Sequence, residues 1–470
     1  MDKNKTIETL AQNWKISFEE AQILFEGIMY KENGEYDKSI SLYDDALKIY
    51  PNSSKLLCVR GEAYLSKQEY ELAINNFNCS LAINPLEEHA YFGRGEAYRE
   101  KGDNDDQAIN DYSNALKLNP KYSAALNNRG LIYYKQGKYK EAIDDYTNVL
   151  RNDSSVDAIA SAYHNRGDVY VKKENYDMAI ADFTKSLKAD SSNSTVYNKR
   201  GFTYLQMRKY DFAIKDFDKA IQYDSSSYIY FFNRGTAFIS LSKYKEALYD
   251  LTHVLQYDIT NNPYKNNHDP YQNLTKTGVL LNRGAVYRLL GEFDKAINDY
   301  SEIIKIDPNN AQAYNNRGNV YKLRGLHKEA MDDYVEAIRL DSKYPEAYHN
   351  RGHENAIMGK LEDAINDFSM AINLNFAHPG TTFLLRGGIY ETKEMFNEAL
   401  EDYTKAIDLD DKDSDAYFMR GNLYFRIGQY DNSIRDFDII LKLNPKVGGI
   451  PDIFEMTKKI RQKAIEMKQK

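Results

Sequence analysis

The sequence has little cysteine, proline or tryptophan: its 470 residues include 2 Cys, 10 Pro and 1 Trp. A secreted array of this length often carries more cysteines, so Cys58 and Cys79 favour a reducing compartment, and we expect a cytoplasmic protein. Scarce proline, without long Gly/Ser tracts, argues against disordered linkers. The first residues, MDKNKTIETLAQNWK, lack the apolar core of a signal peptide, so none is expected.

Long apolar runs and an excess of basic residues are also absent. No apolar stretch reaches the roughly 18 residues that a membrane span needs, so we expect no membrane insertion. The 62 Lys and Arg are outnumbered by 70 Asp and Glu, and the net charge of −8 argues against nucleic acid as a partner. Tyrosine is abundant instead, with 40 residues. Its ring can be buried while its hydroxyl stays wet, which suits a thin structure with shallow cores.

A repeated motif dominates the chain, which exceeds the roughly 250–300 residues at which one hydrophobic core stops growing. The dipeptide Arg-Gly recurs, and seven of the eleven steps between successive glycines are 34 residues. Glu replaces the Arg only before the first glycine of the series. The glycines are Gly27, Gly61, Gly95, Gly130, Gly167, Gly201, Gly235, Gly284, Gly318, Gly352, Gly387 and Gly421.

Each unit carries two apolar patterns at helical spacing. Large apolar or aromatic residues flank the glycine, as Tyr314 and Tyr321 flank Gly318, and predict a first helix. After a polar turn, a small residue is followed four positions later by a ring, as in Ala330 and Tyr334, which predicts a second helix. Proline closes several units because it cannot continue a helix. Two such helices bury their apolar faces only by stacking on neighbours.

The glycine, the small–aromatic–small signature and the closing proline resemble the tetratricopeptide repeat family. The resemblance covers twelve repeats and implies an all-α, right-handed superhelical solenoid of antiparallel helix pairs with a concave groove. A 35-residue pentatricopeptide pattern fits less well, given the 34-residue step and the acidic charge. The expected organisation is an N-terminal lead-in at 1–19, repeats one to seven at 20–260, a polar loop insertion at 261–276, repeats eight to twelve at 277–446 and a C-terminal capping helix at 447–470.

The arginine before each glycine has a candidate partner. Repeats three to twelve all carry Asp 15 or 16 residues after the glycine. We expect structural ion pairs such as Arg129 with Asp145 and Arg317 with Asp333, because the planar guanidinium favours a carboxylate. The alternative is that these arginines bind a ligand.

Asparagine recurs two residues before the glycine, at a position that faces the concave groove in the tetratricopeptide family. Its amide is both donor and acceptor, so a row of asparagines can hold a peptide backbone of any sequence. The alternative, that Asn is merely common at this position, stays open. The candidate peptide-binding residues are Asn128, Asn165, Asn233, Asn282, Asn316 and Asn350.

Other sites receive less support. The family's clamp for a heat-shock chaperone tail would require a lysine at neighbouring groove positions, and none of these residues is Lys, so we do not expect that partner. His349 and His353 lie four apart on one helical face, but no third ligand is evident, so no metal site is expected. No catalytic motif or cofactor motif occurs.

Too few residues lie outside the repeats for a catalytic domain, so no enzyme, catalytic residue or cofactor is expected. The sequence therefore predicts a scaffold or adaptor that binds an extended peptide or a helix in the groove. The alternative is a permanent structural subunit of a larger assembly, which would expose a large apolar patch. The identity of the protein partner is not encoded in these patterns.

Overall fold

The computed structural model describes residues 3–102, 104–257, 274–443 and 453–469. All regular secondary structure in these ranges is helical, which confirms the predicted all-α class. The described residues form two compact units, divided between Ser242 and Lys243. Most of the predicted polar insertion at 261–276 lies outside the described residues, and the expected seven-plus-five organisation stays a prediction.

The N-terminal unit contains fourteen described helices. They are α1 (Lys3–Trp14), α2 (Phe18–Glu32), α3 (Tyr36–Ile49), α4 (Ser54–Ser66), α5 (Tyr70–Ile83), α6 (Glu88–Lys101), α7 (Asp105–Leu118), α8 (Ser123–Lys135), α9 (Tyr139–Asn152), α10 (Val156–Lys172), α11 (Tyr176–Ala189), α12 (Ser194–Gln206), α13 (Tyr210–Tyr223) and α14 (Tyr228–Ser240). Among them, α1 lies inside the predicted lead-in at 1–19.

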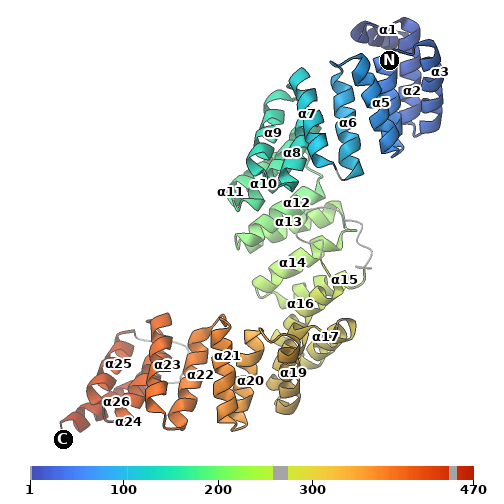
Figure 1. Cartoon of the computed structure of the whole chain (residues 1–470). Helices are drawn as coiled ribbons and strands as arrows, with labels where there is room; N and C mark the ends of the chain where they lie inside the picture. Colours follow the sequence, from blue (N-terminus) through green and yellow to red (C-terminus); the bar gives the residue numbers. More distant parts are fainter. Residues whose placement is uncertain (1–2, 103, 258–273, 444–452, 470) are drawn as a thin grey trace. The chain divides into compact units, whose positions relative to one another are not determined.

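The C-terminal unit contains twelve described helices. They are α15 (Tyr244–Val254), α16 (Lys276–Leu289), α17 (Phe293–Ile306), α18 (Ala311–Leu323), α19 (His327–Leu340), α20 (Pro345–Ile357), α21 (Leu361–Asn373), α22 (Pro379–Thr392), α23 (Phe396–Leu409), α24 (Ser414–Arg426), α25 (Tyr430–Leu443) and α26 (Ile453–Lys468). Within each unit, consecutive helices pack as pairs, and each pair stacks on the next (Figure 1).

Each repeat consists of a first helix, which carries the Arg-Gly dipeptide (Glu-Gly in the first repeat), and a second helix. The turn between them needs a residue with positive φ, and glycine supplies it at the lowest cost. Gly325 and Gly359, for example, both have φ of +73°. Side-chain caps start several first helices, as where Asn310 Oδ1 accepts a hydrogen bond from the Ala313 amide at 3.0 Å.

The core of a repeat is the contact between the Arg-Gly glycine and a ring of the second helix. A Cβ on Gly318 would lie 2.7 Å from Cε1 of Tyr334, whose side chain is fully buried. The small residues Ala330 and Ala337 on the same second helix are also fully buried. Small side chains thus allow the two helices to approach closely, and one large ring fills the space between them.

The structure brings together the predicted arginine–aspartate partners. Arg129 and Asp145 form a two-bond ion pair with nitrogen–oxygen distances of 2.9 and 2.7 Å, and in Arg317 and Asp333 they are 2.9 and 2.8 Å. The same geometry joins Arg94–Asp111, Arg166–Asp182, Arg200–Asp216, Arg283–Asp299, Arg351–Asp367, Arg386–Asp402 and Arg420–Asp436.

The remaining guanidinium nitrogen reaches back to the preceding repeat. Nη1 of Arg317 donates to Ser301 Oγ on α17 at 3.0 Å, while the guanidinium lies 5.5 and 5.8 Å from the ring centres of Tyr314 and Tyr321. One arginine therefore joins its own two helices to the second helix before them. This use of both flanking rings accounts for part of the tyrosine content.

One repeat departs from the pattern. Asn355 stands where most repeats have tyrosine, three residues after the Arg-Gly glycine. The Asn355 side chain is buried and donates a hydrogen bond to Asp367 at 2.9 Å, so the amide adds a third donor to the carboxylate that Arg351 holds.

The C-terminal helix α26 packs on α25 and α24. Its buried residues include Ile453, Thr457 and Ala464. Met456 and Met467 on the same helix are more than one-third exposed.

Candidate functional site

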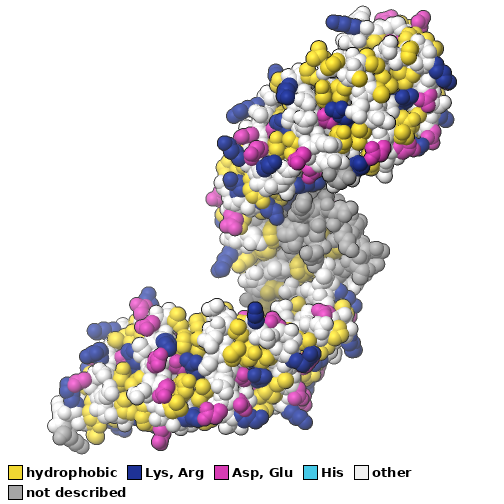
Figure 2. Space-filling model, viewed as in Figure 1, with side chains coloured by type: hydrophobic (Ala, Val, Ile, Leu, Met, Phe, Trp, Pro, Cys, Tyr) yellow, Lys and Arg dark blue, Asp and Glu magenta, His cyan; other side chains and the backbone are white. Residues whose placement is uncertain are grey.

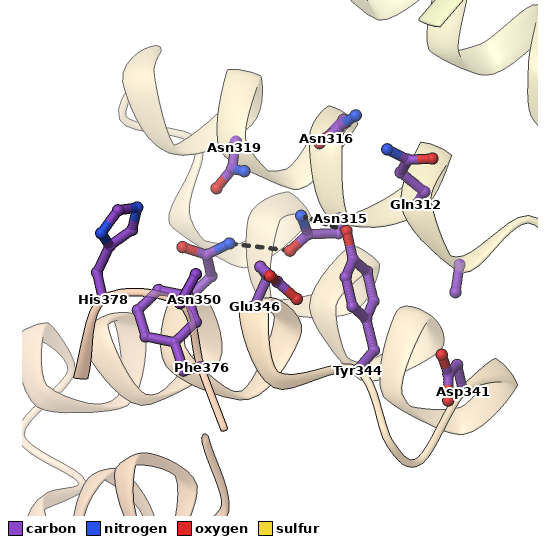
Figure 3. A pocket seen from close by; sticks show the side chains of 12 residues that line it. Gln312, Asn315, Asn316, Asn319, Asp341, Tyr344, Glu346, Asn350, Phe376 and His378 are labelled. Atoms are coloured by element: carbon purple, nitrogen blue, oxygen red, sulfur yellow. Dashed lines mark hydrogen bonds between the residues drawn. The ribbon is translucent and has the colours of Figure 1, made fainter. Parts of the chain in front are cut away.

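A cavity of about 600 Å³ opens on the C-terminal unit between the first helices α18 and α20. The turn that leads into α20 and the segment before α22 complete its walls (Figure 3). It is lined by Ala311, Gln312, Asn315, Asn316, Asn319, Asp341, Tyr344, Glu346, Asn350, Phe376, Ala377 and His378. Carboxamides form much of this lining, together with two carboxylates, the rings of Tyr344 and Phe376 and the imidazole of His378.

Two of the six predicted groove asparagines line this cavity, Asn316 on α18 and Asn350 on α20 (Figure 3). Asn350 Nδ2 donates to Asn315 Oδ1 at 2.9 Å, and Asn315 Nδ2 donates to the Tyr344 hydroxyl at 3.3 Å. This chain of hydrogen bonds orients the side chains from two consecutive repeats. Within the described part of the chain, Asn316 makes no hydrogen bond through its side chain.

Two other predicted asparagines are used inside the fold. Asn233 is 1% exposed and donates to Asn198 Oδ1 at 2.8 Å. Asn128 donates to Glu96 Oε1 at 2.6 Å. Both bonds join a first helix to the first helix of the preceding repeat. Asn233 therefore cannot reach a guest without breaking a buried hydrogen bond, and this part of the predicted ladder serves packing.

Asn165 on α10 and Asn282 on α16 are half-buried. Neither has a side-chain hydrogen bond among the described residues, and neither lines the cavity. The structure thus places the six predicted residues in three different settings, and it brings together only Asn316 and Asn350.

Several lining residues were missed by sequence reasoning. Gln312 and Asn319 lie on α18, where a count of helical turns from Asn316 could have found them. Tyr344 and Phe376 come from segments that precede α20 and α22, where the repeat pattern carries no signal for a groove. Glu346 lies in the first turn of α20, four residues before Asn350, so a count of helical turns from Asn350 could have found it as well.

Of the histidines next to the cavity, His349 is held by the fold. His349 Nδ1 lies 2.9 Å from Thr382 Oγ1, and its ring stacks on Phe376 with centroids 4.5 Å apart. Burial, then the charge of Lys322, lowers the pKa of His349 to about 4, so the ring is neutral at pH 7. His353 Nδ1 lies 3.6 Å from Oε1 of the buried Glu354, which is too far for a hydrogen bond. The contacts with Thr382 and Phe376 therefore fix His349 in the fold.

In the described ranges, one group of three residues has the proximity that a metal ion needs: Glu87, Glu88 and His89. Glu87 is already paired with Lys55 at 2.7 Å, which favours a structural role for this group. No helix among the described residues combines the length and apolar character of a membrane span. In each unit, the face in Figure 2 shows Lys and Arg interspersed with Asp and Glu, without a basic stripe.

Protein-family models match most of the repeat array. A TPR repeat model matches residues 95–137, 284–325 and 389–428, and tetratricopeptide repeat models match 26–53, 121–192, 194–227, 311–344 and 414–447. A comparison with curated proteins finds no match.

Solved structures of similar proteins include MamA, with 28% identity over 34% of this chain and 94% of its own, at a TM-score of 0.33. Yeast Tom70 is 16% identical over 95% and 96%, at a TM-score of 0.44. YrrB, described as a TPR protein with an unusual peptide-binding site, is 23% identical over 43% and 96%, at 0.36.

The repeated helix pairs and the family matches lead to the same conclusion. TPR proteins generally mediate protein–protein interactions and assemblies, and their fold is typically non-catalytic. This chain belongs to the tetratricopeptide repeat family.

Proposed function

We propose that this protein is a non-catalytic scaffold or adaptor that binds an extended segment of a protein partner in the cavity between α18 and α20. The supporting observation is the amide lining: Gln312, Asn315, Asn316, Asn319 and Asn350 converge on one space of about 600 Å³. An extended peptide exposes unpaired N–H and C=O groups along its length. Carboxamides can satisfy both kinds of group without regard to side-chain sequence.

Several lining side chains are already held by hydrogen bonds in the free protein. Hydrogen bonds from Asn350 to Asn315 and from Asn315 to Tyr344 hold three side chains in place, so less side-chain freedom is lost on binding. The Asn316 side chain makes no hydrogen bond among the described residues, so its amide is available to pair with the backbone of a guest. A location in the cytoplasm is part of this proposal and rests on the low cysteine content.

The test begins with a displayed library of random 12-residue peptides panned against the full chain. Synthetic copies of enriched peptides are then titrated by calorimetry. Asn316→Ala should weaken binding by about 1–2 kcal/mol, since it leaves a guest backbone group unpaired. The triple variant Asn282→Ala, Asn316→Ala and Asn350→Ala should abolish it without unfolding the chain.

Asn298→Ala and Asn366→Ala are matched controls, because both side chains are exposed on second helices, α17 and α21, outside the cavity. Each control should leave affinity unchanged. The proposal fails if no peptide is enriched, or if the triple variant binds enriched peptides as tightly as the wild type.

A permanent structural subunit remains the second candidate, and one observation favours it. The last turns of several second helices in the N-terminal unit expose an apolar residue at the same repeat position. These residues are Ile49, Ile83, Leu118 and Tyr223, which are 37–70% exposed. Light scattering behind size exclusion separates the candidates, because an adaptor is monodisperse alone whereas a subunit of this kind self-associates.

A further inference from the structure

The cavity between α18 and α20 carries negative charge that the fold does not neutralise. Asp341 and Glu346 line it, and no lysine or arginine does. Neither carboxylate forms an ion pair within the described ranges. Asp341 Oδ1 accepts a hydrogen bond from the Lys343 amide at 2.9 Å, and the Lys343 side chain is exposed outside the lining.

Two carboxylates on other first helices have a cation from a neighbouring repeat. Glu62 lies 2.6 Å from Lys31, and Asp168 lies 2.5 Å from Lys199. Each lysine comes from an adjacent first helix and cancels the charge locally. Glu346 is half-buried in the first turn of α20 and has no such partner among the described residues. Its carboxylate charge therefore acts on any group that binds in the cavity.

The charge of Glu346 affects the neighbouring phenol of Tyr344. Burial, then the negative charge of Glu346, raises the pKa of Tyr344 to about 12. The phenol therefore keeps its proton at pH 7 and can donate it to a guest carbonyl while accepting from Asn315. Phe376, stacked on His349, adds a half-buried ring to the cavity wall, against which an aliphatic stem or a cation can pack.

We propose that the cavity recognises a basic side chain, lysine or arginine, within an extended peptide segment of the partner. Glu346 and Asp341 hold the cationic end, Phe376 contacts the stem, and the carboxamides of Asn316 and Asn350 hold the backbone on either side. The inference rests on the proposed function and adds its charge selectivity. An acidic segment would be repelled by the two carboxylates.

The experiment uses the same random 12-residue library and the full chain. Lysine and arginine should be enriched in the selected peptides relative to the unselected library. In fluorescence-anisotropy titrations, Glu346→Gln and Asp341→Asn should each weaken the best basic peptide about fivefold, the effect of losing one partly exposed ion pair. Replacing the peptide's basic residue with glutamine should weaken binding similarly and remove its sensitivity to Glu346→Gln.

Glu329→Gln is the matched control. Glu329 lies exposed in the first turn of α19, so this variant makes the same change in net charge at an equivalent helical position away from the cavity. It should leave affinity unchanged, which separates local recognition from general attraction to an acidic protein.

Three results would overturn the charge inference. Enriched peptides without basic residues would do so, as would equal affinity in the wild type and both cavity variants, or an equal loss in Glu329→Gln. If peptides still lose affinity in Asn316→Ala in those cases, the groove proposal survives and only charge selectivity is wrong. If no peptide is enriched, both proposals fail together.

Discussion

The ion pair between Arg317 and Asp333 offers a direct test of how repeats are held together. Arg317→Leu removes both hydrogen bonds to Asp333, the bond to Ser301 on the preceding repeat and the cationic contact with two tyrosines. Asp333 stays behind, only 5% exposed. Because a buried carboxylate without its partner is the costly element, we expect a loss of about 3–5 kcal/mol in the local free energy of unfolding at pH 7.

The cost should depend on pH in a defined direction. Burial raises the pKa of Asp333 above its usual value, while the hydrogen bonds and charge of Arg317 lower it. Without Arg317 the folded-state pKa rises further above the unfolded one. A raised carboxyl pKa destabilises the fold above that pKa, and the penalty is lost as pH falls through it. The difference between wild type and Arg317→Leu should therefore shrink from pH 7 towards pH 4.

Hydrogen exchange measured by mass spectrometry over α18 and α19, with thermal melts of the full chain, reports this loss. Arg324→Leu is the matched control, since Arg324 pairs with Asp294 in solvent, with side chains 38% and 83% exposed, and should cost at most about 1 kcal/mol. Adding Asp333→Asn to Arg317→Leu should restore part of the protection by removing the charge. Unchanged exchange in Arg317→Leu, or a defect independent of pH, would refute the pairing argument.

Two further predictions concern packing and a buried histidine. Gly318→Ala should destabilise the chain by about 1–3 kcal/mol in urea unfolding, because its Cβ would lie 2.7 Å from the buried Tyr334 ring. Gly380→Ala is the control and should cause no measurable loss, because no atom lies within 4 Å of the added Cβ. Burial, then the charge of Lys199, lowers the pKa of His164 to about 4. Stability should fall as pH drops from about 6.5 to 4, because the unfolded chain binds the proton more readily, and NMR titration of the ring should show an apparent pKa below 5. His164→Gln should make the stability of the chain depend less steeply on pH over this range. An NMR midpoint near 6.5 for the His164 ring would contradict the prediction that burial lowers its pKa.

The sequence alone determined the repeated part of this protein. The 34-residue step repeats along the chain. The glycine against a ring such as Tyr334 and the pairing of Arg317 with Asp333 both join residues 16 positions apart within one helix pair. Short-range interactions of this kind recur with the motif, so their pattern is visible along the chain and predicts the fold class. The same pattern predicted that the arginine before the glycine forms an ion pair with the aspartate of the second helix.

Only the tertiary structure decided which asparagines are available to a guest. Asn233 and Asn316 occupy the same repeat position, yet Asn233 is buried against Asn198 whereas Asn316 opens into a cavity. Their difference depends on side chains of the neighbouring repeats, which a motif of one repeat does not contain. Likewise, the cavity takes Tyr344 and Phe376 from connecting segments, and Glu346 lines it without an ion-pair partner among the described residues. Pairing within a repeat is local and can be predicted, whereas the binding surface forms between repeats and depends on their packing.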